Sequence, residues 1–287
     1  MMSISIIIPT LNRPNQVLDL LEKLTQITEE EEIIIVDDSL ESQEKQIKEL
    51  FPNQIVYLNR GAKLGVSSAR NVGALISKNP FLIFLDDDDE FTERWISDFR
   101  KFIKKKPDLV FCNMIRVEPN GDKHEVKISD SRNGAMGNRI VIPGAWMIKK
   151  SLFEKIGGFD ERILFAENTE LFLRVFEERL VVSYIDEFNF IYHPCPTGGS
   201  KNLQNMINSL TLILDKHSKT LTPHVKHLYH QIIGVNWMRF RNFSDARHHL
   251  FQAIKYKPSK IATWGRLGLA SLPFIAKRFY SETVNHG

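Results

Sequence analysis

The first 110 residues alternate short apolar segments with longer amphipathic ones, and this alternation restricts the fold more than any other feature of the chain. The apolar segments, typical of strands buried on both faces, are residues 3–8, 33–36, 54–58 and 81–85. The segments between them, where apolar residues recur at helical spacing, are 14–27, 41–50 and 67–76. This repetition predicts an α/β fold with a mostly parallel, doubly wound sheet and helices on both faces.

From residue 109 the pattern changes to shorter strand-like segments. Asn120-Gly121 between residues 111–117 and 123–128 predicts a hairpin with a type I′ turn, which needs a positive φ at both central residues. Residues 167–178 then predict a helix. After a Pro- and Gly-rich segment the pattern is helical throughout, so we predict one domain over residues 1–200 and a helical extension over 201–287.

The two predicted parts differ in charge. Residues 1–200 contain 25 Lys and Arg against 32 Asp and Glu, and residues 201–287 contain 13 against 3, which gives net charges of −7 and +10. A basic extension favours an anionic partner. Anionic lipid is a better candidate than nucleic acid, because no nucleic-acid-binding motif is found, and a basic face that contacts only water is an equal alternative. Residues 261–280 mix apolar and basic side chains, as a membrane-surface helix does, with a break at Pro273.

The chain carries no recognisable targeting or spanning segment. It begins without a basic stretch followed by a long apolar one, and no apolar run approaches the roughly 18 to 20 residues that cross a bilayer. We therefore expect cytoplasmic chemistry, with any membrane association peripheral. Cys112 and Cys195 lack metal-site or disulfide spacing, so we expect both thiols to be reduced.

Five consecutive carboxylates, Asp86 to Glu90, directly follow a predicted buried strand. Adjacent carboxylates repel one another unless a cation neutralises them. Mg²⁺ and Mn²⁺ prefer oxygen ligands and often bind one or two carboxylates together with substrate phosphates. Ligands bind at the carboxyl ends of parallel strands, so this position favours a metal site over the alternative of a solvated acidic loop.

Other polar residues follow the neighbouring strands. Thr10 and Asn12 come after the first strand and Asp37-Asp38 after the second, where a carboxylate pair could bind a nucleoside or cap the next helix. Gly65 and Arg70 lie around the start of a predicted helix, an arrangement that suits a diphosphate; an ordinary helix cap is the alternative.

Five motifs in order resemble the family 2 glycosyltransferases over about the first 200 residues. They are Ser-Ile-Ile-Ile-Pro-Thr-Leu-Asn-Arg at 5–13, Val-Asp-Asp-Ser at 36–39, Gly-Val-Ser-Ser-Ala-Arg-Asn at 65–71, Phe-Leu-Asp-Asp-Asp at 84–88 and Gly-Gly-Phe-Asp-Glu at 157–161.

The resemblance implies a GT-A fold and assigns roles to the matching residues. Pro9, Thr10 and Asp38 would hold the nucleoside, with Asp37 nearby, and we add Asn12, Arg13, Gly65 and Arg70 as candidate contacts of the nucleotide sugar. Asp86, Asp87 and Asp88 match the DxD motif, which contacts ribose and, through Asp88, the metal bound to the diphosphate. His193 is a further candidate metal ligand, with a structural histidine as the alternative.

The resemblance also implies an inverting displacement at the anomeric carbon. This needs a Lewis acid for the leaving nucleotide diphosphate and a base for the acceptor hydroxyl. The family's base is an Asp at the position of Asn168, and an amide cannot accept a proton at neutral pH. We favour Glu167 as the substitute; Glu170, ionisation of the acceptor with other help, or binding without catalysis are the alternatives.

We therefore predict an enzyme that moves a sugar from a nucleotide diphosphate sugar to a hydroxyl acceptor, such as a polysaccharide or lipid-linked sugar, with Mg²⁺ or Mn²⁺. Trp146 could form an apolar acceptor wall or belong to the core. One alternative is a catalytically impaired module that binds nucleotide sugars. A second is a nucleotidyltransferase, which is disfavoured because residues 9–13 lack its glycine-rich loop.

Overall fold

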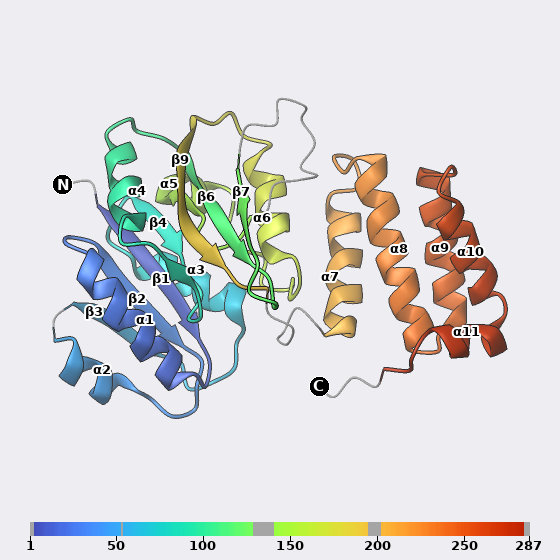
Figure 1. Ribbon diagram of the computed structural model, residues 1–287, viewed down its shortest axis with the longest axis horizontal. Helices are drawn as coiled ribbons and strands as arrows, with labels where there is room; N and C mark the ends of the chain where they lie inside the picture. Colours follow the sequence, from blue (N-terminus) through green and yellow to red (C-terminus); the bar gives the residue numbers. More distant parts are fainter. Residues whose placement is uncertain (1–2, 53, 129–140, 195–201, 284–287) are drawn as a thin grey trace. The chain divides into compact units, whose positions relative to one another are not determined.

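The computed structural model describes residues 3–52, 54–128, 141–194 and 202–283. Contacts divide the chain into two compact units. The first contains most of residues 1–195 and combines strands with helices, and the second contains residues 196–287 and is built from helices (Figure 1). The short segment Arg162–Ala166 belongs to the second unit, where the backbone N–H groups of Leu164 and Phe165 donate to Oγ of Ser209.

The described residues of the first unit form one mixed sheet. Its strands are β1 (Ile4–Thr10), β2 (Glu32–Asp37), β3 (Ile55–Asn59), β4 (Phe81–Phe84), β5 (Glu90–Phe91), β6 (Leu109–Val117), β7 (Lys123–Val126), β8 (Trp146–Lys149) and β9 (Val182–Tyr192). The strand order is β3-β2-β1-β4-β8-β6-β9-β5, and β7 pairs with β6.

Only the first half of the sheet, in the order β3-β2-β1-β4, is parallel throughout. β1 lies between β2 and β4, and β2 pairs with β3, all in parallel, as the apolar runs predict. β8 then runs antiparallel to both β4 and β6, and β5 runs antiparallel to β9, whereas β6 and β9 are parallel. The predicted α/β fold is confirmed, and the prediction of a mostly parallel sheet is corrected to a mixed one.

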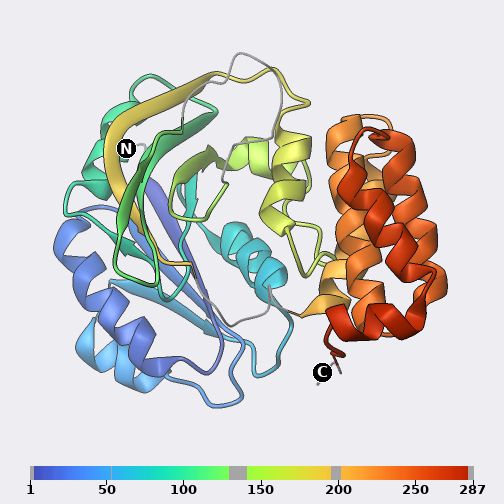
Figure 2. The same ribbon diagram turned by 45° about the vertical axis from the view of Figure 1, so that its right-hand side comes forward.

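Helices cover both faces of this sheet (Figure 2). They are α1 (Pro14–Ile27), α2 (Glu44–Leu50), α3 (Val66–Ile76), α4 (Trp95–Ile103), α5 (Lys150–Lys155) and α6 (Glu167–Val175). α1 shows why they pack: Val17, Leu20, Leu21 and Leu24 share one helical face, and all four are buried. Because helices bury both faces, β1, β2 and β4 consist mostly of apolar residues, and every residue of β1 is buried.

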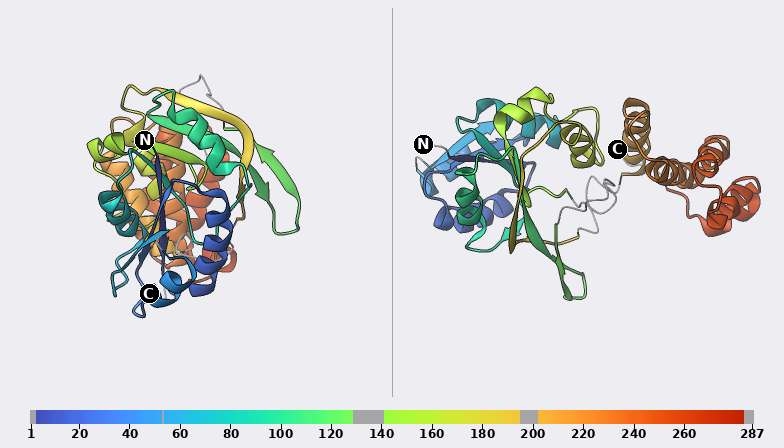
Figure 3. Two further views of the ribbon diagram at one scale, coloured as in Figure 1. Left: turned by 90° about the vertical axis from the view of Figure 1, so that its left-hand side faces the viewer. Right: turned by 90° about the horizontal axis from the view of Figure 1, so that it is seen from above.

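The hairpin of β6 and β7 projects beyond the rest of the sheet (Figure 3). Its turn differs from the predicted type I′, because only Gly121 of the two central residues has a positive φ, at 89°. The N–H of Gly121 donates to the carbonyl of Glu118. This is the longer hairpin connection in which a type I turn is followed by one left-handed residue.

The second unit contains helices α7 (Leu203–Lys216), α8 (Pro223–Arg239), α9 (Phe243–Tyr256), α10 (Ile261–Ala270) and α11 (Pro273–Phe279). Polar side chains cap the first three: Asn202, Thr222 and Asn242 each accept a hydrogen bond from the backbone three residues on. Within the described ranges of the chain, no helix combines the length and the apolar character that crossing a bilayer requires.

Candidate active site

The carboxyl ends of β1, β2 and β4 bring the first group of predicted site residues together. Oγ1 of Thr10 donates to Oδ2 of Asp87 at 2.7 Å, although 77 positions separate the two residues. The backbone carbonyl of Thr10 accepts from the N–H of Asp38. Pro9 lies in β1 opposite Val36 and is buried. The order of the parallel strands therefore places the polar residues that follow them at one edge of the sheet.

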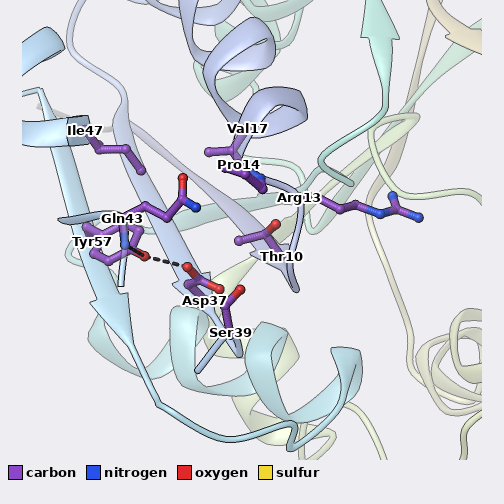
Figure 4. A pocket seen from close by; sticks show the side chains of 9 residues that line it. All are labelled: Thr10, Arg13, Pro14, Val17, Asp37, Ser39, Gln43, Ile47 and Tyr57. Atoms are coloured by element: carbon purple, nitrogen blue, oxygen red, sulfur yellow. Dashed lines mark hydrogen bonds between the residues drawn. The ribbon is translucent and has the colours of Figure 1, made fainter. Parts of the chain in front are cut away.

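A small pocket opens at this edge (Figure 4). It is lined by Thr10, Arg13, Pro14, Val17, Asp37, Ser39, Gln43, Ile47 and Tyr57. The buried carboxylate of Asp37 accepts from the Tyr57 hydroxyl at 2.5 Å and from the Ser39 N–H at 2.8 Å. Burial, together with the hydrogen bond to Asp37, raises the pKa of Tyr57 to about 12. The phenol is therefore neutral at physiological pH and holds Asp37 in one orientation.

Gln43 and Tyr57 are pocket residues that the sequence did not single out. The backbone N–H of Gln43 donates to the Tyr57 hydroxyl at 2.9 Å. Figure 4 shows the Gln43 side chain reaching between Ile47 and Pro14. Its Oε1 is buried and has no hydrogen-bond partner among the described residues. A buried acceptor without a donor is costly, so this atom is available to an N–H group of a ligand.

Asp38 binds the loop that precedes α3. Its Oδ1 pairs with the Arg60 guanidinium at 2.5 Å, and its Oδ2 accepts from the N–H groups of Leu64 and Gly65, both at 2.9 Å. Gly65 has a φ of 96° and immediately precedes α3. In the free protein both oxygens of Asp38 bind the loop before α3, and Asp38 does not line the pocket, so its contact with the nucleoside stays a prediction. The N–H of Gly65, a predicted contact of the nucleotide sugar, donates its hydrogen bond to Asp38.

The acidic run after β4 is neutralised from within the chain. Asp87 is buried and pairs with Arg13 at 2.8 Å, and the half-exposed Asp88 pairs with the same Arg13 nitrogen at 2.9 Å. Oδ2 of Asp89 accepts from the N–H of Asp86 at 2.7 Å. Asn12, which precedes Arg13, has a φ of 54° and donates its N–H to Oγ of Ser39. Arg13 therefore supplies positive charge to the acidic loop.

Burial raises the pKa of two carboxyls of this loop. Desolvation raises the pKa of Asp87 despite its hydrogen bonds from Thr10 and Arg13. It raises the pKa of Asp89 further, because the neighbouring carboxylate of Asp86 adds to the effect. Asp86, Asp88 and Glu90 are the more solvent-accessible carboxylates of the run.

The predicted metal ligands do not converge in the protein alone. Nε2 of His193 lies 3.1 Å from Oε2 of Glu90, and Asp86 and Asp88 pair with arginines. In the described parts of the chain, no group of three or more His, Cys, Asp and Glu side chains is arranged to hold a metal ion. The prediction that Asp88, Asp86 and His193 bind a metal together with the donor diphosphate therefore stays a prediction.

Arg70 links the acidic loop to α6. The guanidinium is 2% exposed; Nη2 donates to Oδ1 of Asp86 at 2.6 Å, and Nη1 donates to Oε1 of Glu167 at 3.1 Å. Burial lowers the pKa of Arg70, but Asp86 and Glu167 outweigh it, and the net shift is upward. In the free protein the charge of Arg70 is shared by two carboxylates, which it positions, so its contact with a diphosphate stays a prediction.

The first turn of α6 separates the two candidate bases. Glu167 is 18% exposed and accepts from Arg70 and, at 2.9 Å, from Nδ2 of Asn168. Glu170 is fully buried and binds Arg174 through both oxygens, at 2.9 and 2.7 Å. A carboxylate enclosed in this way cannot reach a substrate, so the alternative of Glu170 as the base is wrong. Asn168 has its Oδ1 buried and unpaired among the described residues.

Trp146 belongs to the core. It is fully buried, with its ring 5.5 Å from that of Phe84 and 5.0 Å from that of Phe172. Such edge-on and tilted aromatic contacts are typical of a packed interior. The alternative of an exposed acceptor wall is therefore wrong.

Comparisons with known proteins agree with this architecture. The chain is 32% identical over 200 residues to an uncharacterised glycosyltransferase of Haemophilus influenzae, covering 63% of this chain and 64% of the relative. It is 31% identical over 184 residues to the uncharacterised glycosyltransferase YwdF of Bacillus subtilis, covering 60% of this chain and 68% of the relative. The chain thus spans slightly less than two thirds of the length of the Haemophilus relative.

The fold also matches a solved structure. The crystal structure of Staphylococcus aureus TarS 1-349 in complex with UDP-GlcNAc aligns with a TM-score of 0.64 and 19% identity, over 96% of this chain and 88% of that one. This likeness confirms the predicted GT-A fold. The sequence profile of Glycosyl transferase family 2 matches residues 5–157, which is more than half of the chain. The chain therefore belongs to glycosyl transferase family 2.

Proposed function

We propose that the protein transfers a sugar from a nucleotide diphosphate sugar to a hydroxyl acceptor. The observation that carries this proposal is the convergence of three elements on one edge of the sheet. The pocket around Asp37, the acidic loop and the first turn of α6 are joined through Thr10–Asp87 and Arg70–Glu167 contacts. A nucleobase site, an acidic diphosphate site and a candidate base are thereby joined in one unit, as sugar transfer requires.

The pocket of Figure 4 receives the nucleobase in this proposal. Its polar groups are the carboxylate of Asp37, the unpaired Oε1 of Gln43 and the hydroxyl of Thr10. These groups can exchange hydrogen bonds with the polar edge of a base, while Pro14, Val17 and Ile47 offer apolar contact. The TarS complex with UDP-GlcNAc supports a uridine diphosphate sugar as the first donor to test.

Mg²⁺ or Mn²⁺ fits the accessible end of the acidic loop. Asp88 and Asp86 carry hard oxygen ligands and are 50% and 38% exposed. They would hold the ion together with the donor diphosphate, where the ion supplies positive charge to the leaving nucleotide diphosphate. Arg13 holds part of this acidic loop in the free protein and contributes a fixed positive charge beside it.

Glu167 serves as the general base. It is the partly exposed carboxylate of the α6 first turn, whereas Glu170 is committed to Arg174. Arg70 and Asn168 both donate to Oε1 of Glu167 and fix its orientation, so its other oxygen can accept the proton of the acceptor hydroxyl. Attack from the side opposite the leaving diphosphate gives inversion at the anomeric carbon.

The acceptor is a hydroxyl of a growing polysaccharide or of a lipid-linked sugar. The basic charge of residues 201–287 supports the second source, because an anionic membrane would hold the enzyme near such an acceptor. We therefore propose that the enzyme associates peripherally with the membrane.

The proposal is tested by screening the purified protein with Mn²⁺ against nucleotide diphosphate sugars, in parallel with Asp88→Ala. Metal-dependent hydrolysis or transfer of one donor, abolished by chelation and lowered at least about 100-fold in Asp88→Ala, is the expected result. Release of pyrophosphate from a nucleoside triphosphate and a sugar phosphate would instead indicate a nucleotidyltransferase. Donor binding without turnover, even with lipid-linked acceptors, would indicate the impaired binding module.

A further inference from the structure

The last two helices of the second unit expose an unusual number of large apolar side chains. We call this surface the C-terminal face. Its members, each between 41% and 83% exposed, are Ile261, Trp264, Leu272, Phe274, Ile275 and Phe279. Single exposed apolar residues are common on proteins, but six large ones between residues 261 and 279 mark a candidate interaction surface.

The packing of α10 and α11 explains why these residues face outward. The positions that the bundle buries are small: Thr263 and Ala270 in α10 and Ala276 in α11. Oγ1 of Thr263 also accepts from Nε2 of Gln231 in α8 at 2.9 Å. Small residues and the partly buried Leu267 occupy the inner face, so burial in the bundle does not account for the large exposed side chains.

The same segment is free of negative charge. Between residues 246 and 281 the sequence has seven Lys and Arg and no Asp or Glu. Lys260, Lys277 and Arg278 are exposed beside the apolar residues, and the Arg278 guanidinium lies 5.3 Å from the centre of the Phe274 ring. Apolar side chains flanked only by positive charge complement an anionic lipid surface, into which aromatic side chains insert while Lys and Arg remain at the headgroups.

We propose that the C-terminal face docks on an anionic lipid bilayer, with α10 and α11 lying in the headgroup region. A second copy of the chain is a poorer occupant, because self-association would bring Lys260, Lys277 and Arg278 of one copy against the same basic residues of the other. Nucleic acid would use the charge and could stack on Phe274 and Phe279, but it would leave the aliphatic side chains of Ile261, Leu272 and Ile275 in contact with water. This inference deepens the proposed membrane association and does not depend on sugar transfer.

The test measures co-flotation of the full chain with vesicles of phosphatidylcholine alone or mixed with phosphatidylglycerol. We expect binding to the mixed vesicles, little binding to the neutral ones, and weakening with added salt. Lys277→Ala combined with Arg278→Ala should weaken binding about 25-fold, because each basic side chain near the surface contributes about fivefold. Phe274→Ser combined with Phe279→Ser should weaken it at least about tenfold.

Leu75→Ser is the matched control, since Leu75 in α3 is 75% exposed, as Phe274 is. It should bind vesicles like the parent, and circular dichroism should show all variants folded. Loss of binding in the charge variant with no effect of the Phe variant would overturn docking by this face, as would equal loss in Leu75→Ser. Concentration-dependent dimerisation that the Phe variant abolishes, without vesicle binding, would assign the face to a second copy. Because no sugar donor is present, none of these outcomes bears on the transfer reaction.

Discussion

Nη1 of Arg70 donates a hydrogen bond to Oε1 of Glu167 at 3.1 Å, across 97 positions of sequence. The other arm of the same guanidinium holds Asp86. One buried cation therefore ties the candidate base to the acidic loop. This arrangement fixes the Glu167 carboxylate before any substrate arrives. Arg70 is therefore a positioning residue, and replacing it should lower both the stability of the fold and the rate of catalysis.

Replacing Arg70 should therefore destabilise the fold. Arg70→Met keeps most of the side-chain volume but leaves Asp86 and Glu167 without their cation, and we expect the free energy of unfolding to fall by about 3 kcal/mol. Urea denaturation measures this change. Lys48→Ala is the control, because it removes an exposed pair with Glu44 in α2 and should cost less than about 0.5 kcal/mol. Equal losses in both variants would contradict a structural bridge at Arg70.

Trp146 should tolerate Phe but not Ala. Trp146→Phe keeps a ring against Phe84 and Phe172, and no partner of Nε1 is lost among the described residues, so the cost should stay below about 1.5 kcal/mol. Trp146→Ala should cost about 3 to 5 kcal/mol. Thermal or urea unfolding gives both values. A raised acceptor KM in a fully stable Trp146→Phe variant would instead support contact with the acceptor.

Tyr57 should make stability depend on alkaline pH. Its pKa is raised from 10.0 to about 12 in the fold, so between those values the unfolded chain loses the proton first. The contribution of the neutral phenol is complete below pH 10 and disappears as the pH rises to about 12. Tyr57→Phe cannot ionise, so its free energy of unfolding should fall less steeply over this interval. Parallel slopes for the two proteins would contradict the Tyr57–Asp37 contact.

Gln43 should contribute to nucleotide binding. If its unpaired Oε1 accepts a hydrogen bond from the base, Gln43→Ala should weaken binding of the preferred nucleoside diphosphate about tenfold. Isothermal titration calorimetry with uridine, cytidine and guanosine diphosphates measures this. Gln46→Ala, at an exposed glutamine of α2, is the matched control. Unchanged affinity in Gln43→Ala would place the base elsewhere.

Much of the fold could be predicted because its determinants are local. Strands β1, β2, β3 and β4 and helix α1 follow from runs of apolar residues and helical spacing, and the strand ends locate Thr10, Asp37 and Asp87. The errors concern long-range burial. Nothing near Glu170 in the sequence indicates full enclosure, and Arg70 lies far from Glu167 along the chain. The sequence does not show that Asp38 pairs with Arg60 or that Trp146 packs against Phe172, because distant segments supply these partners.

Gln43 could not have been predicted from spacing alone. It lies in a polar stretch before α2, outside every motif, and becomes part of the pocket only because β2 and β3 place Asp37 and Tyr57 beside it. The turn at Gly121 was missed for a related reason: the Asn-Gly pair indicates a hairpin, but the loop length decides which residues need a positive φ.

The most direct test of the account compares the parent with Glu167→Gln for both donor binding and turnover. Glu167→Gln keeps an oxygen that can accept from Arg70 but cannot take a proton. We predict donor affinity within about twofold of the parent and turnover reduced about 100- to 10,000-fold, the contribution of a general base. Undiminished turnover in Glu167→Gln would contradict Glu167 as the base. An inactive parent that gains activity through Asn168→Asp would contradict the account as a whole.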